Sequence, residues 1–265
     1  MTRCLKCYEE IIPSQSDFHP PCAQDLFGAA EGGIPLEQIQ ERYDISARHP
    51  ELRDLTMRLA QATAILCVPH TLYRHPTSGV VSLTKRLDEG TSGEDCDVDT
   101  IRLILDEEAD TYRDNGSYEQ IAQIVEEHST ISKLDVLNFW EQLAFGWVAG
   151  CSELGAESFA LYQPHRGLYT LAPAFDLIAT AVLNPNPQEH NELKLTLNRK
   201  HRNITRSDFE AAMKKSGIKA KIINGLFARF VEAKNVWFEI IDNSFVDEEL
   251  KAKYKSLLSS NISKL

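Results

Sequence analysis

The sequence has no long apolar run. Its most apolar window, residues 134–148, carries Asp135 and Glu141. A helix that spans a bilayer needs about 20 predominantly apolar residues, so this window predicts a buried helix and no membrane span. No apolar stretch follows Met1 either. We therefore expect no secretory signal and, by default, a cytoplasmic location.

Positive charge is also scarce. The 265 residues include 28 lysines and arginines against 39 acidic residues, a formal net charge of −11. Wide, non-specific contact with nucleic-acid phosphates needs a basic face, so we expect no direct binding of that kind. DNA binding through a partner is compatible with this charge. The densest basic stretch, residues 199–202, is typical of a solvated loop, and the alternative is a contact with a phosphate or a partner.

Cysteines are few, and three of the six lie in the first 22 residues. Cys4-x2-Cys7 followed by His19-x2-Cys22 offers four donors of the Cys3His type, the set that tetrahedral zinc prefers. The spacing favours a zinc site, and the alternative is a small hairpin with reduced thiols and a surface histidine. A reducing cytoplasm argues against a disulfide framework. The other cysteines lie apart and are interpreted as plain thiols: Cys67, Cys96 and Cys151.

The rest of the sequence predicts an α+β fold that is predominantly α-helical. One hairpin is expected from strands at 66–73 and 79–87, and another from strands at 158–163 and 167–171. Helices are expected at 35–43, 54–65, 98–109, 117–128 and 133–149. Further on, Thr205-x-x-Asp208 predicts a capped helix that ends before Gly217, and Asp247 is expected to cap a last helix. Between them, apolar residues from Ile222 to Ile241 predict one long core-facing helix.

Two segments carry a specific resemblance. Residues 150–161 read GCSELGAESFAL, and residues 171–177 read LAPAFDL. This layout resembles the HipA-like serine/threonine kinases of bacterial toxin–antitoxin systems, whose segments usually read G-N-x-D-x-H-x-K-N-F-S-L and A-P-x-Y-D-L. Further stretches match the family in the same order, namely residues 4–28, 55–60, 84–88, 115–122 and 237–251. The chain is therefore identified as a member of this superfamily.

The resemblance implies three parts. Residues 1–28 would form a small Cys/His module, and residues 29–90 a reduced N-terminal lobe with a helix and a hairpin. Residues 91–265 would form the helical, protein-kinase-like C-terminal lobe. In the family, a glycine-rich phosphate loop and a strand lysine precede the Pro-Glu-Leu segment. Here residues 43–52, which lead into that segment, contain neither glycine nor lysine.

The resemblance also implies site residues. Glu153 falls on the family's catalytic Asp, and its extra methylene moves the carboxylate by roughly 1 Å. Ser158 replaces the metal-binding Asn, and Asp176 matches the second magnesium ligand. Lys85 and Leu87 fall on the hinge that borders the adenine pocket. Without the resemblance, Asp176 would be interpreted as a helix cap and Glu153 as a solvated carboxylate.

Two further positions lose charge or reverse it. The family's His falls on Gly155, and its Lys falls on Glu157. A carboxylate at that position repels a transferring phosphoryl group. We therefore expect a catalytically impaired pseudokinase, a binding or regulatory component of a toxin–antitoxin-type system whose partner is a related kinase or an antitoxin protein. ATP and magnesium would bind only if activity is retained.

Two alternatives remain open. The first is an active serine/threonine kinase that uses Glu153 and Asp176. The second is a zinc-stabilised adaptor, in which the N-terminal module makes the main contact with a partner.

Overall fold

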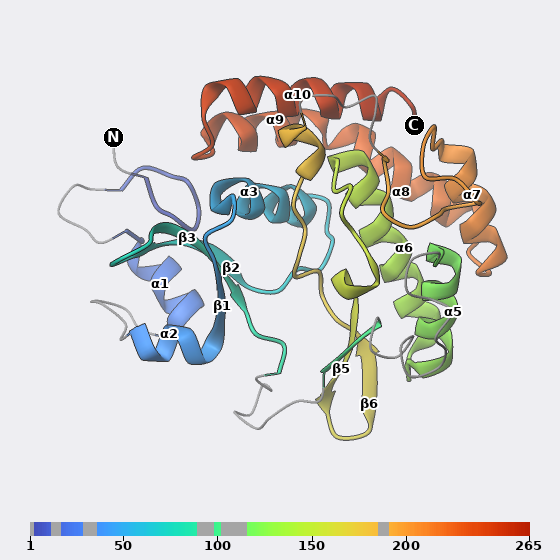
Figure 1. The fold of residues 1–265 in the computed structure, drawn as a ribbon, viewed down its shortest axis with the longest axis horizontal. Helices are drawn as coiled ribbons and strands as arrows, with labels where there is room; N and C mark the ends of the chain where they lie inside the picture. Colours follow the sequence, from blue (N-terminus) through green and yellow to red (C-terminus); the bar gives the residue numbers. More distant parts are fainter. Residues whose placement is uncertain (1–2, 12–16, 29–35, 89–97, 102–115, 185–190) are drawn as a thin grey trace.

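The structure, a computed structural model, describes residues 3–11, 17–28, 36–88, 98–101, 116–184 and 191–265 (Figure 1). Its elements are, in order, α1 (Pro20–Phe27), α2 (Leu36–Arg42), β1 (Tyr43–Ser46), α3 (Pro50–Gln61), β2 (His70–His75), β3 (Gly79–Lys85), β4 (Val98–Thr100), α5 (Tyr118–His128), α6 (Ser132–Ala149), η1 (Ala156–Ser158), β5 (Ala160–His165), β6 (Leu168–Leu171), η2 (Thr180–Leu183), α7 (Arg206–Lys215), α8 (Ala220–Glu232), α9 (Lys234–Asn243) and α10 (Glu248–Ile262). The predicted α+β, mainly helical fold is confirmed.

The N-terminal half contains an antiparallel sheet of order β1-β3-β2. The predicted hairpin is its β2–β3 pair, with His75 opposite Gly79. Strand β1 was not predicted, because its four residues pair with β3 only and carry little periodicity. The sheet shares a small apolar core with the N-terminal Cys/His segment, which includes Cys4, Leu5 and Tyr8.

Helix α3 lies between this sheet and the C-terminal helices (Figure 1). It begins at Pro50, four residues before the predicted start, because proline fits the first helical turn, where its missing N–H costs nothing. Its far side contacts α9, where Nε1 of Trp237 donates to the carbonyl of Leu59 at 2.8 Å. The two halves of the chain are therefore fastened together through α3.

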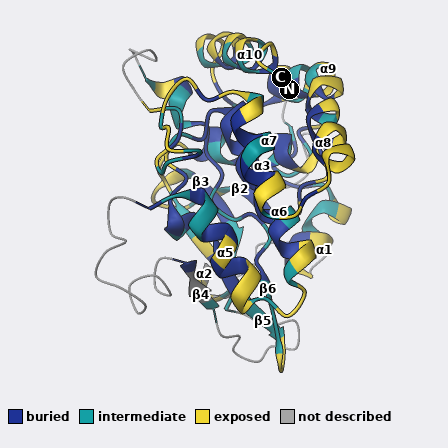
Figure 2. Cartoon of the chain, turned by 90° about the vertical axis from the view of Figure 1, so that its right-hand side faces the viewer, coloured by how far each residue is buried: buried dark blue, intermediate teal, exposed yellow. Residues whose placement is uncertain are grey.

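Helix α6 is the predicted buried helix. Its aromatic residues, Phe139, Trp140, Phe145 and Trp147, are almost completely buried, and the helix is dark over most of its length in Figure 2. Gly150 ends it with φ +82°, a left-handed conformation that glycine adopts at little cost. No described helix is long and apolar enough to cross a membrane.

A second sheet has the order β4-β5-β6. The predicted hairpin is present as β5 and β6, and Gly167 supplies the positive φ of its turn. The helix expected at 98–109 is wrong at its start, because Val98–Thr100 pair with β5 as strand β4. The remainder of that helix, residues 102–109, lies outside the described residues, as do Asn115 and Cys96.

The C-terminal caps are as predicted. Thr205 and Asp208 form the capping box of α7, and the side chain of Asp247 caps α10 by accepting from the Leu250 N–H at 2.8 Å. The single long helix from Ile222 to Ile241 is wrong, since the chain divides into α8 and α9 at Ala233. The division turns α9 toward α3, where Trp237 makes its hydrogen bond to Leu59.

Candidate functional site

The segment after α6 presents the candidate catalytic residues unequally. Glu153 is exposed, whereas Ser158 is buried, with 6% of its surface accessible. The Ser158 hydroxyl accepts a hydrogen bond from the Gly155 N–H at 3.3 Å and so closes the short helix η1. A hydroxyl used in this way is a poor candidate for an open metal ligand.

Asp176 forms an ion pair with Arg53 from the first turn of α3. The arginine side chain is only 17% exposed, and its Nε is buried without a hydrogen-bond partner among the described residues. A guanidinium group therefore faces the carboxylate that the family would offer to magnesium. Sequence reasoning missed Arg53, because 123 positions separate it from Asp176 and no local pattern joins them.

Glu157 is likewise engaged, through an ion pair with Lys194. Tyr118 joins the loop that carries Lys194 to the segment after α6. Its hydroxyl donates to the Leu154 carbonyl at 2.6 Å and accepts from the Leu195 N–H at 3.3 Å. Burial raises the pKa of Tyr118, which keeps its hydroxyl protonated as the donor. The residues at the family's His and Lys positions thus belong to an internally bonded loop.

The two hinge residues lie at the end of β3. Lys85 donates its backbone N–H to the Pro69 carbonyl at 2.8 Å, and Leu87 packs against the larger core. In the described part of the chain, no hydrogen bond or ion pair joins either residue to Glu153, Ser158 or Asp176. The structure therefore does not bring the predicted nucleotide-site residues together through direct polar contacts.

These side chains form no ready-made magnesium site. Oδ1 of Asp176 pairs with Arg53, Ser158 is bonded to the backbone, and magnesium prefers carboxylate oxygens and water. Within the described ranges, only one group of three or more histidine, cysteine or acidic side chains is placed to hold a metal, and it lies elsewhere.

That group is the predicted Cys4, Cys7, His19 and Cys22, which the structure brings together. Their donor atoms all lie within 4.8 Å of one another, and Sγ of Cys7 is 3.2 Å from Nδ1 of His19. The other ring nitrogen, Nε2, donates to the Glu10 carbonyl at 3.0 Å. A bond of this kind fixes the ring and leaves Nδ1 for the metal, as is usual around metal-binding histidines.

The donor set fits a tetrahedral metal ion. None of the four residues is fully exposed, and all three of these cysteines are free thiols. Burial opposes ionisation of the thiols and raises the pKa of Cys7 and, to about 12, that of Cys22, whereas backbone hydrogen bonds from Cys7, His19 and Lys6 lower the pKa of Cys4 to about 7. The geometry of the four donors allows the cluster to hold a metal ion, whose positive charge would favour the thiolates.

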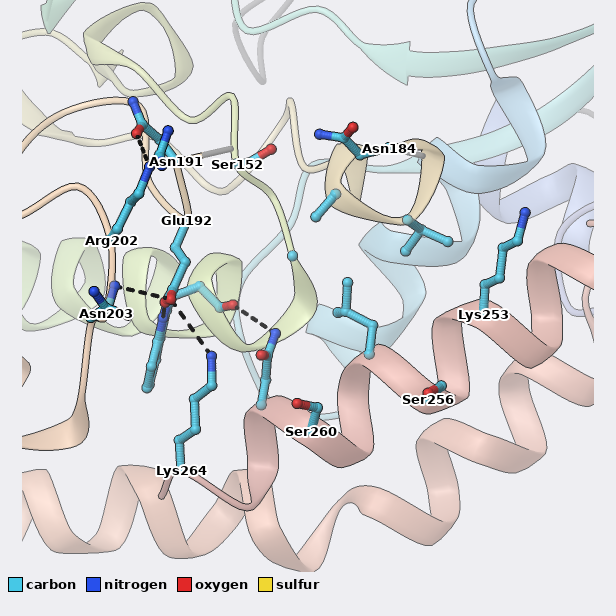
Figure 3. Close-up of a pocket in the computed structure, with 16 residues that line it drawn as sticks. Ser152, Asn184, Asn191, Glu192, Arg202, Asn203, Lys253, Ser256, Ser260 and Lys264 are labelled. Atoms are coloured by element: carbon cyan, nitrogen blue, oxygen red, sulfur yellow. Dashed lines mark hydrogen bonds and ion pairs between the residues drawn. The ribbon is translucent and has the colours of Figure 1, made fainter. Parts of the chain in front are cut away.

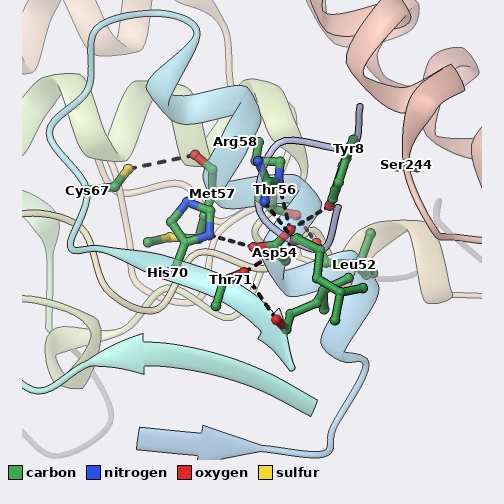
Figure 4. Close-up of polar contacts among 12 residues, drawn as sticks. Tyr8, Leu52, Asp54, Thr56, Met57, Arg58, Cys67, His70, Thr71 and Ser244 are labelled. Carbon is green, nitrogen blue, oxygen red and sulfur yellow. Dashed lines mark hydrogen bonds and ion pairs between the residues drawn. The ribbon is translucent and has the colours of Figure 1, made fainter. Parts of the chain in front are cut away.

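A buried polar network joins this module to the fold (Figure 4). The Tyr8 hydroxyl donates to Oδ2 of Asp54 at 2.6 Å, Nε of Arg58 donates to the same oxygen at 2.7 Å, and Nδ1 of His70 lies 2.7 Å from Oδ1. Arg58 also stacks over the Tyr8 ring at 4.0 Å and donates to the Leu5 carbonyl. The segment that carries the metal donors is thus bonded to α3 and β2.

Comparisons with known proteins agree with this fold. The model of the HipA-like C-terminal domain matches residues 41–237. Among solved structures, HipA of the Shewanella oneidensis MR-1 toxin–antitoxin system, determined with HipB and its operator DNA, has a TM-score of 0.64 at 14% identity. The match covers 82% of this chain and 56% of that one.

The Helicobacter pylori proinflammatory kinase CtkA has a TM-score of 0.62 at 15% identity, over 84% of this chain and 87% of that one. At such identities the likeness concerns the fold. A search of curated proteins found no match.

Proposed function

The chain belongs to the family of HipA-like C-terminal domains, and on that premise we propose that it is a kinase-fold protein impaired in phosphoryl transfer. It would act as a binding or regulatory component of a toxin–antitoxin-type system. The observation that carries the proposal is the ion pair between Asp176 and Arg53, which engages the one intact metal-ligand position within the chain.

The physical reason lies in what phosphoryl transfer requires. The protein must position the nucleotide and neutralise its phosphates, with a phosphate loop, a lysine and metal ions. Residues 43–52 contain no glycine or lysine, and β1, the strand within them, has only four residues. Glu157 adds negative charge where the family has a lysine, and Lys194 already pairs with it.

Isothermal titration with ATP and magnesium tests the impairment. We expect no binding at millimolar nucleotide for the wild-type chain. Tight binding that disappears in Asp176→Ala would overturn the proposal. Asp242→Ala is the matched control, because Asp242 also forms an ion pair with a basic side chain, Lys255, but lies on α9, outside the candidate site.

The regulatory part concerns a protein partner. The similar Shewanella HipA was solved with HipB and operator DNA, which makes an antitoxin protein or a related kinase the partner class proposed for this chain. Co-expression with the proteins encoded beside it, followed by affinity purification, tests this. We expect a stable complex with such a neighbour, and recovery of the chain alone beside every such neighbour contradicts the regulatory part.

An active kinase is the second candidate. It is favoured by the exposure of Glu153, which leaves that carboxylate accessible to a substrate hydroxyl. Incorporation of labelled phosphate into the chain or into a bacterial extract, abolished by Glu153→Gln, would support this candidate over the first.

For the N-terminal cluster we propose zinc as the occupant and a zinc-stabilised adaptor role as the third candidate. Three thiolates and an imidazole suit zinc in a closed structural site. Metal analysis of the purified chain should give about one zinc per molecule. Cys7→Ser should lose it, whereas Cys67→Ser, a thiol outside the cluster, should keep it.

A further inference from the structure

A cavity of about 890 Å³ lies beside the start of the segment that follows α6 (Figure 3). Its walls come from the end of α6, from η2, from the loop at 191–203 and from one face of α10. Ser152 lines it, whereas Glu153, Ser158 and Asp176 do not. The cavity is therefore separate from the candidate kinase centre, and its volume falls in the range of ligand pockets.

The α10 wall is a regular polar row. Lys253, Ser256 and Ser260 on α10, and Lys264 two residues after its end, follow one another at near-helical spacing and face the cavity. Lys253 and Lys264 are eleven positions apart, so at about 1.5 Å per residue their Cα atoms lie about 16 Å apart. The hydroxyls of Ser256 and Ser260 have no partner in the described part of the chain, so they are available to a ligand.

The opposite wall adds a third cation, Arg202, whose Nε donates to the Asn191 side chain at 3.0 Å. Among the described residues of the lining, Glu192 is the one acidic side chain, and its charge is compensated. Its oxygens accept from Nε1 of Trp147 at 2.9 Å and from the Asn203 N–H at 3.2 Å, and the Lys264 ammonium lies 3.7 Å away.

The described lining, with Lys253, Lys264 and Arg202 against Glu192, is thus net positive in a chain of net charge −11. Lys253 pairs with Glu249 on the outside of α10, but both side chains are more than half exposed. Such pairs contribute little and exchange readily for another anion. An anionic ligand is the class that this lining recognises, and it would meet cations at both ends of the cavity.

We propose that this cavity binds an extended acidic peptide segment of a partner protein, about five residues long, with an acidic group near each end. An extended chain rises about 3.3 Å per residue, so the first and fifth Cα atoms lie about 13 Å apart. The lysine and glutamate side chains are long enough to close the remaining distance to Lys253 and Lys264. The unpaired serine hydroxyls lie where the peptide backbone would pass. A nucleic-acid duplex is too wide for the cavity, and a single phosphate would reach only one of its ends.

This inference deepens the proposed regulatory function and rests on it. Fluorescence anisotropy tests it with a fluorescein-labelled peptide that has a glutamate at each end of a three-residue Gly-Ala-Gly spacer. A second peptide with glutamine at both ends is the ligand control. We expect saturable binding of the first peptide that weakens as salt rises, and no binding of the second.

Charge reversal locates the binding. The double variant K253E/K264E should bind the glutamate peptide at least tenfold more weakly, whereas Lys221→Glu, an exposed lysine on α8 outside the cavity, should bind as the wild type does. Equal binding by the double variant and the wild type, no binding by the wild type, or equal binding of both peptides would overturn the inference. Circular dichroism of each variant checks that it is folded.

The two proposals fail separately. ATP binding that requires Asp176 would overturn the impaired-kinase proposal without changing the peptide result. Loss of the peptide result would leave the impairment intact. Competition by ATP for the peptide in the wild-type chain, together with direct ATP binding that is lost in the K253E/K264E variant, would assign the cavity to a nucleotide and overturn the peptide inference.

Discussion

At the scale of single residues, Asp54 is bonded to three other side chains of the N-terminal half. Its carboxylate is fully buried and is bonded by Tyr8, Arg58 and His70. Burial alone would raise its pKa, but the charges of Arg58 and His70 hold it at about 2. A buried carboxylate with this many donors is costly to remove, because its partners lose their counter-charge.

Asp54→Asn should lower the free energy of unfolding at pH 7 by about 3 kcal/mol. Because the folded pKa is depressed, the stabilisation by the charged carboxylate is present above the ordinary value near 4 and is lost as pH falls toward 2. Urea unfolding of both proteins between pH 7 and pH 3 checks this. A stability difference that stays constant as the pH falls toward 3 would contradict it.

Gly150 is a second residue with a specific requirement. Its φ is +82°, and an added Cβ would lie 3.0 Å from Cδ2 of Leu257 and 3.2 Å from Cβ of Ala181. Gly150→Ala should therefore cost about 2 kcal/mol, from backbone strain and crowding together. Gly217→Ala isolates the strain, because Gly217 has φ +79° and no atom within 4 Å of an added Cβ. Equal losses in thermal unfolding would show that crowding contributes nothing.

At the scale of elements, the loop before α7 is held by its cap. Asp208 accepts from the Thr205 N–H at 3.0 Å, from the Asn198 side chain at 2.9 Å and from the Lys200 ammonium at 2.8 Å. Lys200, interpreted from the sequence as part of a solvated loop, therefore belongs to the capping network of α7.

Asp208→Ala should destabilise the protein by about 2 kcal/mol, because it removes the N3 side chain of the capping box and leaves several donors unpaired. Asp247→Ala is the comparison, since Asp247 caps α10 at an exposed site through one bond to the Leu250 N–H. It should cost about 1 kcal/mol or less. Denaturant unfolding measures both, and an Asp247 variant that loses more than the Asp208 variant would contradict the difference.

Strong local signals made most elements predictable. Helix α6 followed from its apolar window, and the caps of α7 and α10 followed from Thr205, Asp208 and Asp247. The division between α8 and α9 was missed because Ala233 is a good helix former and marks no end. The Arg53–Asp176 pair was missed because tertiary structure alone brings these residues together. For the candidate metal cluster, the spacing of the donors was sufficient.

At the scale of the whole molecule, the N-terminal Cys/His segment contacts the junction between α9 and α10. Tyr8 packs edge-on against Phe245 with ring centroids 5.0 Å apart, and Arg3 donates to the Asn243 carbonyl at 2.7 Å. Loss of metal should therefore affect more than the first residues.

Removal of the metal with a chelator, or Cys7→Ser, should lower the melting temperature by more than about 5 °C. Hydrogen exchange should show faster exchange in β2, in α3 and near Phe245, whereas α5 should keep its protection. Cys67→Ser controls for the loss of a thiol outside the cluster. Unchanged exchange in β2 and α3 after metal loss would contradict the connection.

The three tryptophans of the chain, Trp140, Trp147 and Trp237, all lie in the larger core, and none lies in the core of the Cys/His segment. Each is at most 2% exposed, so their emission should be blue-shifted. Tryptophan fluorescence will therefore report on the larger core, including the contact of Trp237 with α3. Visible absorption of a cobalt-substituted cluster would report on the Cys/His segment. The order in which this segment and the larger core unfold can therefore be followed in one sample at two wavelengths.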